Sequence, residues 1–168
     1  MTNRSLAESY LEKARARLKI LPVLFDAEAH SDVVREAQEI VELALKGMLR
    51  MLGVEPPHWH DVGGLLVEYR DRLPAAVAAG VDDLAEVSAW LRKEREFSFY
   101  GEIDFIPTER YGDADAQRAM AGAHRLSGTG RSRMSLGPKA VPEAPTDRPG
   151  SGRASGACAA RRPASARR

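Results

Sequence analysis

The 168-residue sequence has a single cysteine, few aromatic residues and no long apolar run. One cysteine, Cys158, excludes an intramolecular disulfide and a cysteine-based metal site. No segment reaches the roughly 18 consecutive apolar residues that a membrane-spanning helix requires, and the charged N-terminus is unlike a signal peptide. These absences predict a cytoplasmic protein that makes no contact with a membrane.

Strand patterns are absent as well, whereas apolar residues recur at helical spacing along most of the chain. Steps of three and four residues predict amphipathic helices over about residues 5–21, 31–53, 61–69 and 83–100, with a last short helix at 113–126. The connections between successive helices are short, which favours antiparallel neighbours. We therefore expect an all-α fold, an up-and-down bundle of four to five helices.

The second of these helices, residues 31–53, carries the longest apolar stripe. The stripe is wider than one partner helix requires, which predicts a central helix contacted on several sides. Ser31 or Asp32 can cap its start, and Gly53 can end it in the left-handed conformation. Pro22 is expected to kink or end the helix that precedes it.

The composition changes abruptly after residue 126. Residues 127–168 are rich in Gly, Ser, Pro, Ala and Arg and carry nine basic residues against two acidic ones, while residues 1–126 carry 16 basic and 22 acidic residues. A segment with so few large apolar side chains cannot bury enough surface to become ordered. We therefore expect one helical domain at 1–126 and a disordered tail at 127–168, whose arginines either bind an acidic partner or are inert.

Several segments taken together resemble the HEPN domain, a small all-α domain of prokaryotes and higher eukaryotes. The first is the helix EAQEIVELALKGMLRMLGVEPP, which contains Glu42 and Lys46 and is followed by the turn HWHDVGGLL. The later segments are AWLRKEREFSFYGE and IPTERYGDADAQRAMAGA. The resemblance covers about residues 4–126 and implies the same helical fold.

The histidine-rich turn after the second helix is either a chemical site or a structural hinge. His60 and Asp61 open the third helix, where a ring nitrogen or a carboxylate can satisfy free backbone N–H groups. We interpret both as structural residues that hold the turn. His58 and His60 would offer two metal ligands with no third nearby, which is too few for a zinc site. We expect no metal and no cofactor.

Many HEPN proteins are metal-independent ribonucleases, so the resemblance directs attention to the fourth helix. The family's active motif is an arginine followed four to six residues later by a histidine, and two copies meet across a dimer interface. A base would take the proton of a ribose 2′-hydroxyl while the arginine stabilises the charge on the phosphate. No histidine follows Arg92 or Arg95 at these positions, where Tyr100 stands instead. The spacing recurs at Arg118 and His124 on the last helix, which we regard as coincidence.

Arg95 falls on the apolar stripe of the fourth helix and therefore needs a partner. One interpretation is an ion pair within the bundle, to Glu42 or Asp61. The other is a ligand site at which Arg92, Arg95 and Tyr100 bind a phosphate or a nucleotide. In an active enzyme, Arg95 and Tyr100 would be the candidate catalytic residues, although an unperturbed phenol with a pKa of about 10 is a poor base at neutral pH.

Two further features receive structural interpretations. Trp59 and Trp90 are expected to pack in the core or in an interface rather than to stack on bases. The Gly63-Gly64 pair lacks the spacing of a phosphate-binding loop and is not followed by Lys-Ser or Lys-Thr. We expect these glycines to permit a close approach between helices.

The sequence leaves three functions open. By resemblance, the first is a non-catalytic homodimeric module that binds a nucleotide or RNA and pairs with a nucleotidyltransferase-type partner in a toxin–antitoxin or stress/defence system. The second is a ribonuclease with a degenerate active motif, and the third is a purely structural helical dimerisation scaffold. We favour the first, because the scaffold residues are present while the histidine of the motif is missing.

Overall fold

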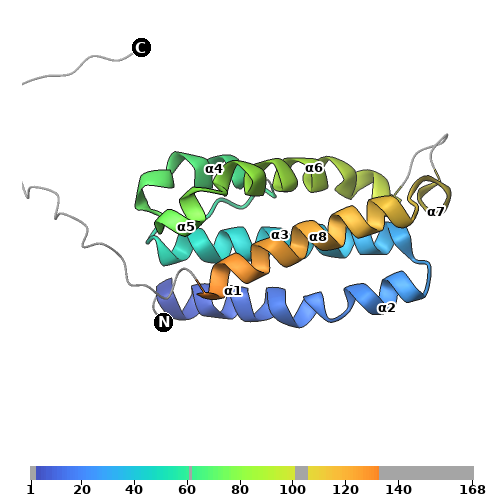
Figure 1. Cartoon of the computed structure of the whole chain (residues 1–168), viewed down its shortest axis with the longest axis horizontal. Coiled ribbons are helices and arrows are strands. Elements are labelled where there is room, and N and C mark those ends of the chain that lie inside the picture. Colours follow the sequence, from blue (N-terminus) through green and yellow to red (C-terminus); the bar gives the residue numbers. More distant parts are fainter. Residues whose placement is uncertain (1–2, 61, 101–105, 133–168) are drawn as a thin grey trace, which may run out of the picture.

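Four long helices laid side by side form the body of the molecule (Figure 1). The structure is a computed structural model, and it describes residues 3–60, 62–100 and 106–132. In this described part every regular element is a helix, so the prediction of an all-α fold is confirmed. The long helices alternate in direction along the chain, as in an up-and-down bundle. They are α1 (Asn3–Leu18), α3 (His30–Met51), α6 (Val81–Tyr100) and α8 (Asp113–Ser132).

Short helices occupy the two ends of this bundle (Figure 1). One end holds α2 (Leu21–Asp26) and α7 (Pro107–Arg110), and the other holds α4 (Gly63–Glu68), the 3-10 helix η1 (Arg70–Arg72) and α5 (Ala75–Ala78). Pro22 does not kink a long helix, because α1 has already ended at Leu18. It lies instead in the first turn of α2, where the missing N–H group of proline is no loss.

The central helix is α3, as the width of its apolar stripe predicted. It packs against α1, α6 and α8 and also touches α2 and α4. Its fully buried side chains include Ile40, Leu45, Met48 and Leu49. Burial of each such side chain contributes roughly 1.5–3 kcal/mol relative to an exposed position. The other long helices are therefore held together largely through their contacts with α3.

The end of α3 confirms the predicted role of Gly53. This residue has a φ of +76°. The N–H groups of Gly53 and Val54 donate to the carbonyl oxygens of Arg50 and Leu49, respectively. These are the two hydrogen bonds of a Schellman motif, which a glycine in the left-handed conformation completes at the C-terminus of a helix.

The start of α3 differs from the prediction. The helix begins at His30, and no described side chain caps it, so Ser31 and Asp32 lie within its first turn. The His30 side chain makes a tertiary contact instead, with its Nε2 atom 2.9 Å from a carboxylate oxygen of Asp113. This contact joins the first residues of α3 and α8.

The helix α8 extends to Ser132, beyond the predicted domain boundary at residue 126. Leu126 is a buried side chain of this helix, and because each further residue of a helix adds one backbone hydrogen bond, the helix continues past this anchor. The first residues of the predicted disordered tail are therefore helical. Residues 133–168 lie outside the described residues, and their disorder stays a prediction.

Gly63 marks a close approach between α4 and α6. A Cβ atom added at Gly63 would lie 2.8 Å from the Cα atom of Ala85 and 3.0 Å from the Cβ atom of Ser88. Carbon atoms do not approach one another this closely, so the packing of these helices requires glycine here. For a Cβ atom added at Gly64, no heavy atom of the described residues lies within 4 Å. The predicted role therefore applies to Gly63 and not to Gly64.

We expect Gly63→Ala to lower the free energy of unfolding by about 1–3 kcal/mol, because the added methyl group overlaps the backbone of α6. Gly64→Ala is the matched control. Its methyl group meets open space, so it should be neutral or stabilise the fold by up to about 1 kcal/mol, since alanine favours a helix over glycine. Chemical denaturation of both variants measures the difference, and equal stabilities would contradict the close approach.

Candidate functional site

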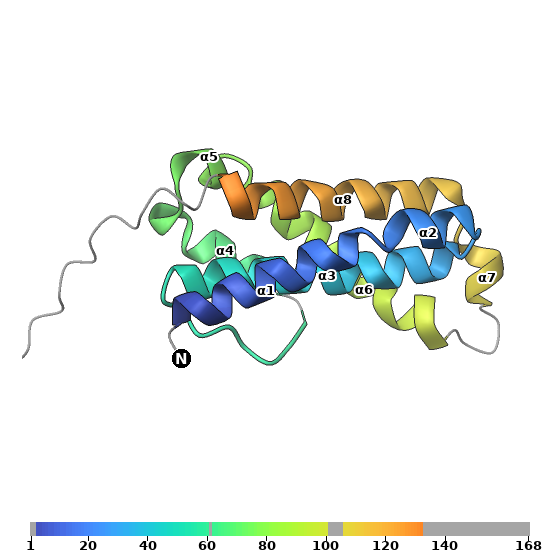
Figure 2. The same ribbon diagram turned by 90° about the horizontal axis from the view of Figure 1, so that it is seen from below.

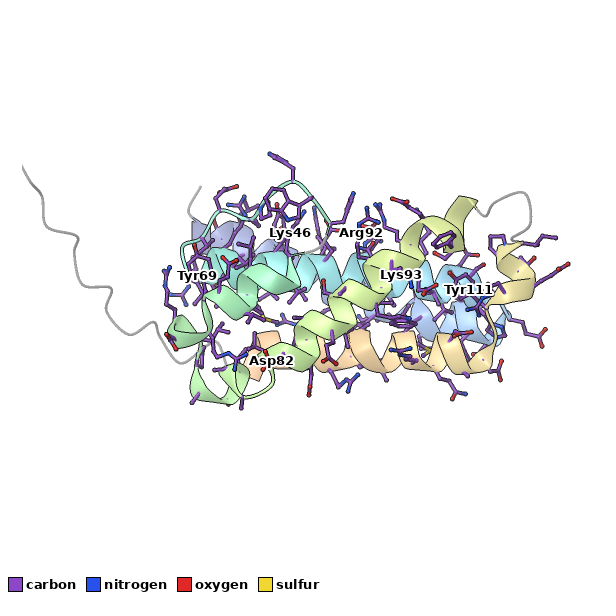
Figure 3. The ribbon with its side chains drawn as sticks, turned by 90° about the horizontal axis from the view of Figure 1, so that it is seen from above. Lys46, Tyr69, Asp82, Arg92, Lys93 and Tyr111 are labelled. Carbon is purple, nitrogen blue, oxygen red and sulfur yellow. The ribbon has the colours of Figure 1, made fainter. Side chains whose placement is uncertain are left out.

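The candidate site is a group of charged side chains that three elements bring to one side of the bundle. We call it the polar cluster, and its members are Glu39, Glu42, Lys46, His60, Arg92 and Arg95. The three members on α3 follow one another at steps of three and four residues, which places them on the same side of that helix. The two arginines come from α6, and the histidine comes from the turn after α3. Figure 3 shows Lys46 and Arg92 on the side of the bundle along which this turn runs.

Glu42 is the hub of the polar cluster. Its carboxylate accepts hydrogen bonds from Gln38 Nε2 at 3.0 Å and from Lys46 Nζ at 2.8 Å. His60 Nδ1 lies 2.9 Å from the same carboxylate. Because a carboxylate can only accept, this ring nitrogen carries the hydrogen. Three donors thus converge on one anion whose side chain is only 12% exposed.

Burial and hydrogen bonding act on the Glu42 carboxyl in opposite directions. Burial disfavours the charged form and raises the pKa, whereas the hydrogen bonds from Lys46, Gln38 and His60 favour the charged form. The hydrogen bonds prevail, so the pKa of Glu42 lies below its ordinary value of 4.5. Ionisation of Glu42 therefore stabilises the folded protein.

His60 lies at the end of the turn, and its partner comes from the central helix. Through Glu42 it fastens the turn to α3. Its predicted structural role fits this contact and still awaits a test by substitution. Asp61, the other residue predicted to hold the turn, lies outside the described residues. His58 is exposed, and within the described ranges no three His, Cys, Asp or Glu side chains are grouped as a metal site.

Arg95 has an acidic partner within the bundle, but a different one from those predicted. Its Nη2 atom donates to Glu39 Oε1 at 3.0 Å, whereas the sequence pointed to Glu42 or Asp61. The carboxylate of Glu42 already accepts from three donors, and Glu39 lies one turn earlier on the same side of α3. Both members of the Arg95–Glu39 pair remain partly exposed to solvent.

The other two predicted ligand-binding residues also lie on α6. Arg92, one turn before Arg95, reaches Glu96 on its own helix at 3.2 Å. Because α3 and α6 run in opposite directions (Figure 1), Arg92 lies level with the turn of α3 that carries Glu42. The helix runs to Tyr100, whose side chain lies outside the described part of the chain. The structure thus brings both arginines to the polar cluster, and the place of Tyr100 stays a prediction.

Sequence analysis missed that an imidazole reaches the same side of α3 as Arg95. Glu39 and Glu42 are one turn apart, and they bind Arg95 and His60, respectively. The turn thus brings the His60 imidazole to the side of α3 that Arg95 contacts. The available signal was a pair of acids on one side of α3, but the sequence did not show which basic residue belongs to each acid.

The residues Arg118 and His124, which repeat the motif's spacing, do not form a site. They are six residues apart on α8, or about 240° around a helix, so they point to different sides. The Arg118 guanidinium lies 4.1 Å from the centre of the Trp90 ring. That ring packs against the hydrophobic core, as predicted.

Trp59 does not pack in the core, so the core alternative of its prediction is wrong. Its side chain is 63% exposed. Pro56 is the buried residue of this turn, whereas His58 and Trp59 are exposed. The other alternative, packing of Trp59 in an interface with another molecule, stays a prediction.

Comparisons with known proteins agree with this helical arrangement. The sequence model of the HEPN domain matches residues 7–131. The chain belongs to the HEPN domain family. The crystal structure of an archaeal HEPN homologue has a similar fold, with a TM-score of 0.60, 22% sequence identity, and coverage of 76% of this chain and 97% of that chain. Among proteins of curated function, none matches the chain.

The HEPN match contains the whole polar cluster and ends inside α8. The family's ribonuclease motif is nevertheless incomplete in this HEPN chain, because the required positions after Arg92 and Arg95 hold no histidine. Of the helices that the structure describes, none is long and apolar enough to cross a membrane.

We expect Glu42→Gln to remove part of the acid sensitivity of this HEPN domain. Because the pKa of Glu42 is lowered in the folded state, its ionisation stabilises the fold above the ordinary pKa of 4.5, and this stabilisation is lost as the pH falls toward the lowered folded value. The difference in unfolding free energy between wild type and variant should therefore be largest at neutral pH and shrink below pH 4.5.

Thermal unfolding followed by circular dichroism, from neutral to acidic pH, measures this difference. Glu8→Gln is the control, because Glu8 pairs with Arg4 at an exposed position of α1 and exposed pairs add little to stability. It should differ little from wild type at any pH. A Glu42→Gln stability difference that is the same at neutral and acidic pH would contradict the assignment of Glu42 as a stabilising anion.

Proposed function

We propose that this HEPN protein binds a nucleotide or RNA through the polar cluster, without catalysing a reaction of its own. The observation that carries the proposal is the pair of partly exposed arginines, Arg92 and Arg95, beside Lys46 and His60 on one side of the bundle. A guanidinium group can bind two oxygens of one phosphate with parallel hydrogen bonds. A ligand that carries phosphates therefore suits this arrangement.

A phosphate can reach the two arginines although each has an acidic neighbour. Arg92 and Glu96 are four residues apart on a helix surface, where such ion pairs contribute roughly 0.3–0.5 kcal/mol. The Arg95–Glu39 pair is also partly open to solvent. Lys46 is held more firmly, because both it and its partner are largely buried. The arginines are therefore the first contacts that a phosphate would make.

The proposal extends to the assembly that the family resemblance implies. The chain forms a homodimer in the cytoplasm and pairs with a nucleotidyltransferase-type protein in a toxin–antitoxin or stress/defence system. The support is its membership of the HEPN family together with the missing histidine on α6. A chain without that histidine contributes by binding, and its partner contributes the chemistry.

We expect Arg95→Gln to weaken the binding of ATP and of short RNAs by roughly 10- to 150-fold, because hydrogen bonds between charged groups contribute about 1.5–3 kcal/mol. Isothermal titration calorimetry measures both affinities. Arg4→Gln is the matched control, since Arg4 is an exposed arginine of α1 that pairs with Glu8, and it should bind like wild type. The arginine-rich C-terminal residues are common to all variants, so their contribution cancels.

Two outcomes count against this proposal. Equal affinities of wild type and Arg95→Gln would remove the polar cluster as the binding site. No binding of ATP or RNA by wild type, together with a monomeric mass in solution, would leave a structural scaffold as the better description.

A ribonuclease with a degenerate motif is the second candidate, and the contact between His60 and Glu42 favours it. A carboxylate bound to Nδ1 orients an imidazole and leaves Nε2 to accept a proton. The ring would take the proton of a ribose 2′-hydroxyl, the 2′-oxygen would attack phosphorus, and the bond from phosphorus to the 5′-oxygen would break as that oxygen takes a proton from water. Arg95 would stabilise the negative charge that develops on the phosphate.

We expect wild type to cleave RNA no faster than the variants Arg95→Ala, Tyr100→Phe and His60→Ala, because binding needs no base. A gel assay with a labelled RNA measures all four proteins under the same conditions. Cleavage by wild type that is lost in both Arg95→Ala and His60→Ala would replace the first proposal with the second.

A further inference from the structure

The turn between α3 and α4 holds a large aromatic side chain away from the bundle. Trp59 is mostly exposed, and neither the hydrophobic core nor the contacts of the polar cluster involve its ring. Each Å² of apolar surface left in water forgoes about 25 cal/mol of stabilisation. Tryptophan is enriched at interfaces and offers a flat aromatic face on which a base can stack, so an exposed Trp59 is a candidate binding residue.

Contacts at both ends fix the turn that carries Trp59. Near its start, Glu55 accepts hydrogen bonds from both terminal nitrogens of Arg50, at the end of α3. At its other end, His60 binds Glu42, two turns earlier on the same helix. The indole ring therefore lies on a segment that is attached to the central helix on both sides.

Two prolines stiffen the segment between these contacts. Pro56 is buried and Pro57 is half-buried, and the ring of proline fixes its own backbone φ angle. A side chain that is already held in place loses little entropy when a ligand covers it. The turn thus presents Trp59 in a form suited to binding.

The surroundings of Trp59 are polar. His58 and His60 flank it in the sequence, and His60 connects it through Glu42 to the ammonium group of Lys46. An aromatic ring beside imidazole and ammonium groups offers a stacking surface for a base together with donors for phosphate oxygens.

Trp59 also lies apart from the other exposed apolar side chains. Among the side chains that the structure describes, the other large apolar ones that are exposed are Ile20, Val23 and Ile106. They belong to or adjoin α2 and α7 at one end of the bundle, whereas the turn after α3 bulges from its side (Figure 2). The core of a protein–protein interface is a patch of several apolar residues. A single ring among polar groups fits a nucleobase better.

We propose that Trp59 is a stacking platform for a base of single-stranded RNA whose phosphates bind the polar cluster. This inference rests on the proposed function, to which it adds the base contact and the class of ligand. Every base has a π face that can stack on an indole ring, so the contact tolerates different sequences. The arginines of α6 and Lys46 take the backbone phosphates.

Two observations favour a strand over a free nucleotide. Pockets for small ligands enclose most of the ligand surface, whereas a ring exposed on a projecting turn covers one face of a base. The polar cluster is also extended: Glu39 and Lys46 are separated by about 10 Å along α3, at 1.5 Å per residue. A strand makes several such contacts at once, and each of them contributes to the free energy of binding.

The test measures the affinity of full-length protein for a short fluorescently labelled oligoadenylate RNA by anisotropy. We expect Trp59→Ala to weaken binding roughly five- to a hundredfold, which is the range for loss of one base–aromatic stack. Trp59→Phe keeps an aromatic face and should lie between wild type and Trp59→Ala. Val23→Ala is the matched control, because Val23 is an equally exposed apolar residue on α2, and it should bind like wild type.

Intrinsic fluorescence provides a second measurement. The chain has two tryptophans, so the variant Trp90→Phe leaves Trp59 as the single reporter. Stacking of adenine should quench its emission with the same affinity that anisotropy gives. Circular dichroism should show that Trp59→Ala folds like wild type, since the ring is mostly outside the core.

The outcomes separate this inference from the proposed function. If wild type and Trp59→Ala bind RNA equally well, the stacking platform is wrong and the proposed function stands. If wild type binds no RNA, the RNA assignment and the platform both fail. If Trp59→Ala changes only the mass of the protein in solution, Trp59 belongs to a protein interface and the inference is overturned. If ATP binding is weakened as much as RNA binding, the ligand is a free nucleotide and the assignment to a strand is wrong.

Discussion

The hydrogen bonds to the Glu42 carboxylate hold the candidate site together. They join two side chains of the central helix to the turn that follows it. A buried charge that loses its partners is costly, so the carboxylate and its donors keep one another in place. The position of His60 depends on this anion, and the position of the turn and of Trp59 depends on His60. The two proposed ligand contacts outside α6, Lys46 and Trp59, therefore both depend on Glu42 for their position.

The scaffold could be predicted from the sequence because its determinants are local. The broad apolar stripe of α3 identifies a central helix without any knowledge of its neighbours. Gly53 identifies the end of α3, because the left-handed conformation that stops a helix is a property of one residue. The start of α3 was harder to predict from the sequence. Ser31 and Asp32 are good caps by composition, but the helix begins at His30, whose side chain contacts Asp113 on a helix far along the chain.

The site could be predicted only in part, because charge pairing depends on register. An acidic partner for Arg95 could be expected from its place on the apolar stripe, yet Glu39 and Glu42 lie on the same side of α3 and differ by one turn. A shift of α6 by that distance exchanges the partners while similar apolar surfaces stay in contact. The exposure of Trp59 could not be predicted either, because it also depends on which of several candidate residues takes one position. The turn contains several residues able to fill one buried position, and Pro56 fills it.

The HEPN bundle and the chemistry of this chain are determined by different residues. Buried side chains such as Leu45 and Leu49 specify the scaffold, and any chain with that pattern can adopt it. The function depends on which charged residues line one side of α3. Here that side carries the imidazole of His60, which the Glu42 carboxylate holds in place, whereas the motif positions on α6 hold no histidine.

The hub at Glu42 also makes ligand occupancy and proton uptake interdependent. An anion that draws Lys46 or His60 away leaves the carboxylate with fewer donors, and its affinity for a proton increases. At a pH close to the pKa of this carboxyl, the complex would then hold more proton on Glu42 than the free protein does. By reciprocity, a proton on Glu42 favours the bound anion to the same extent. A side chain that needs no direct contact with the ligand thus couples the site to the acidity of its surroundings.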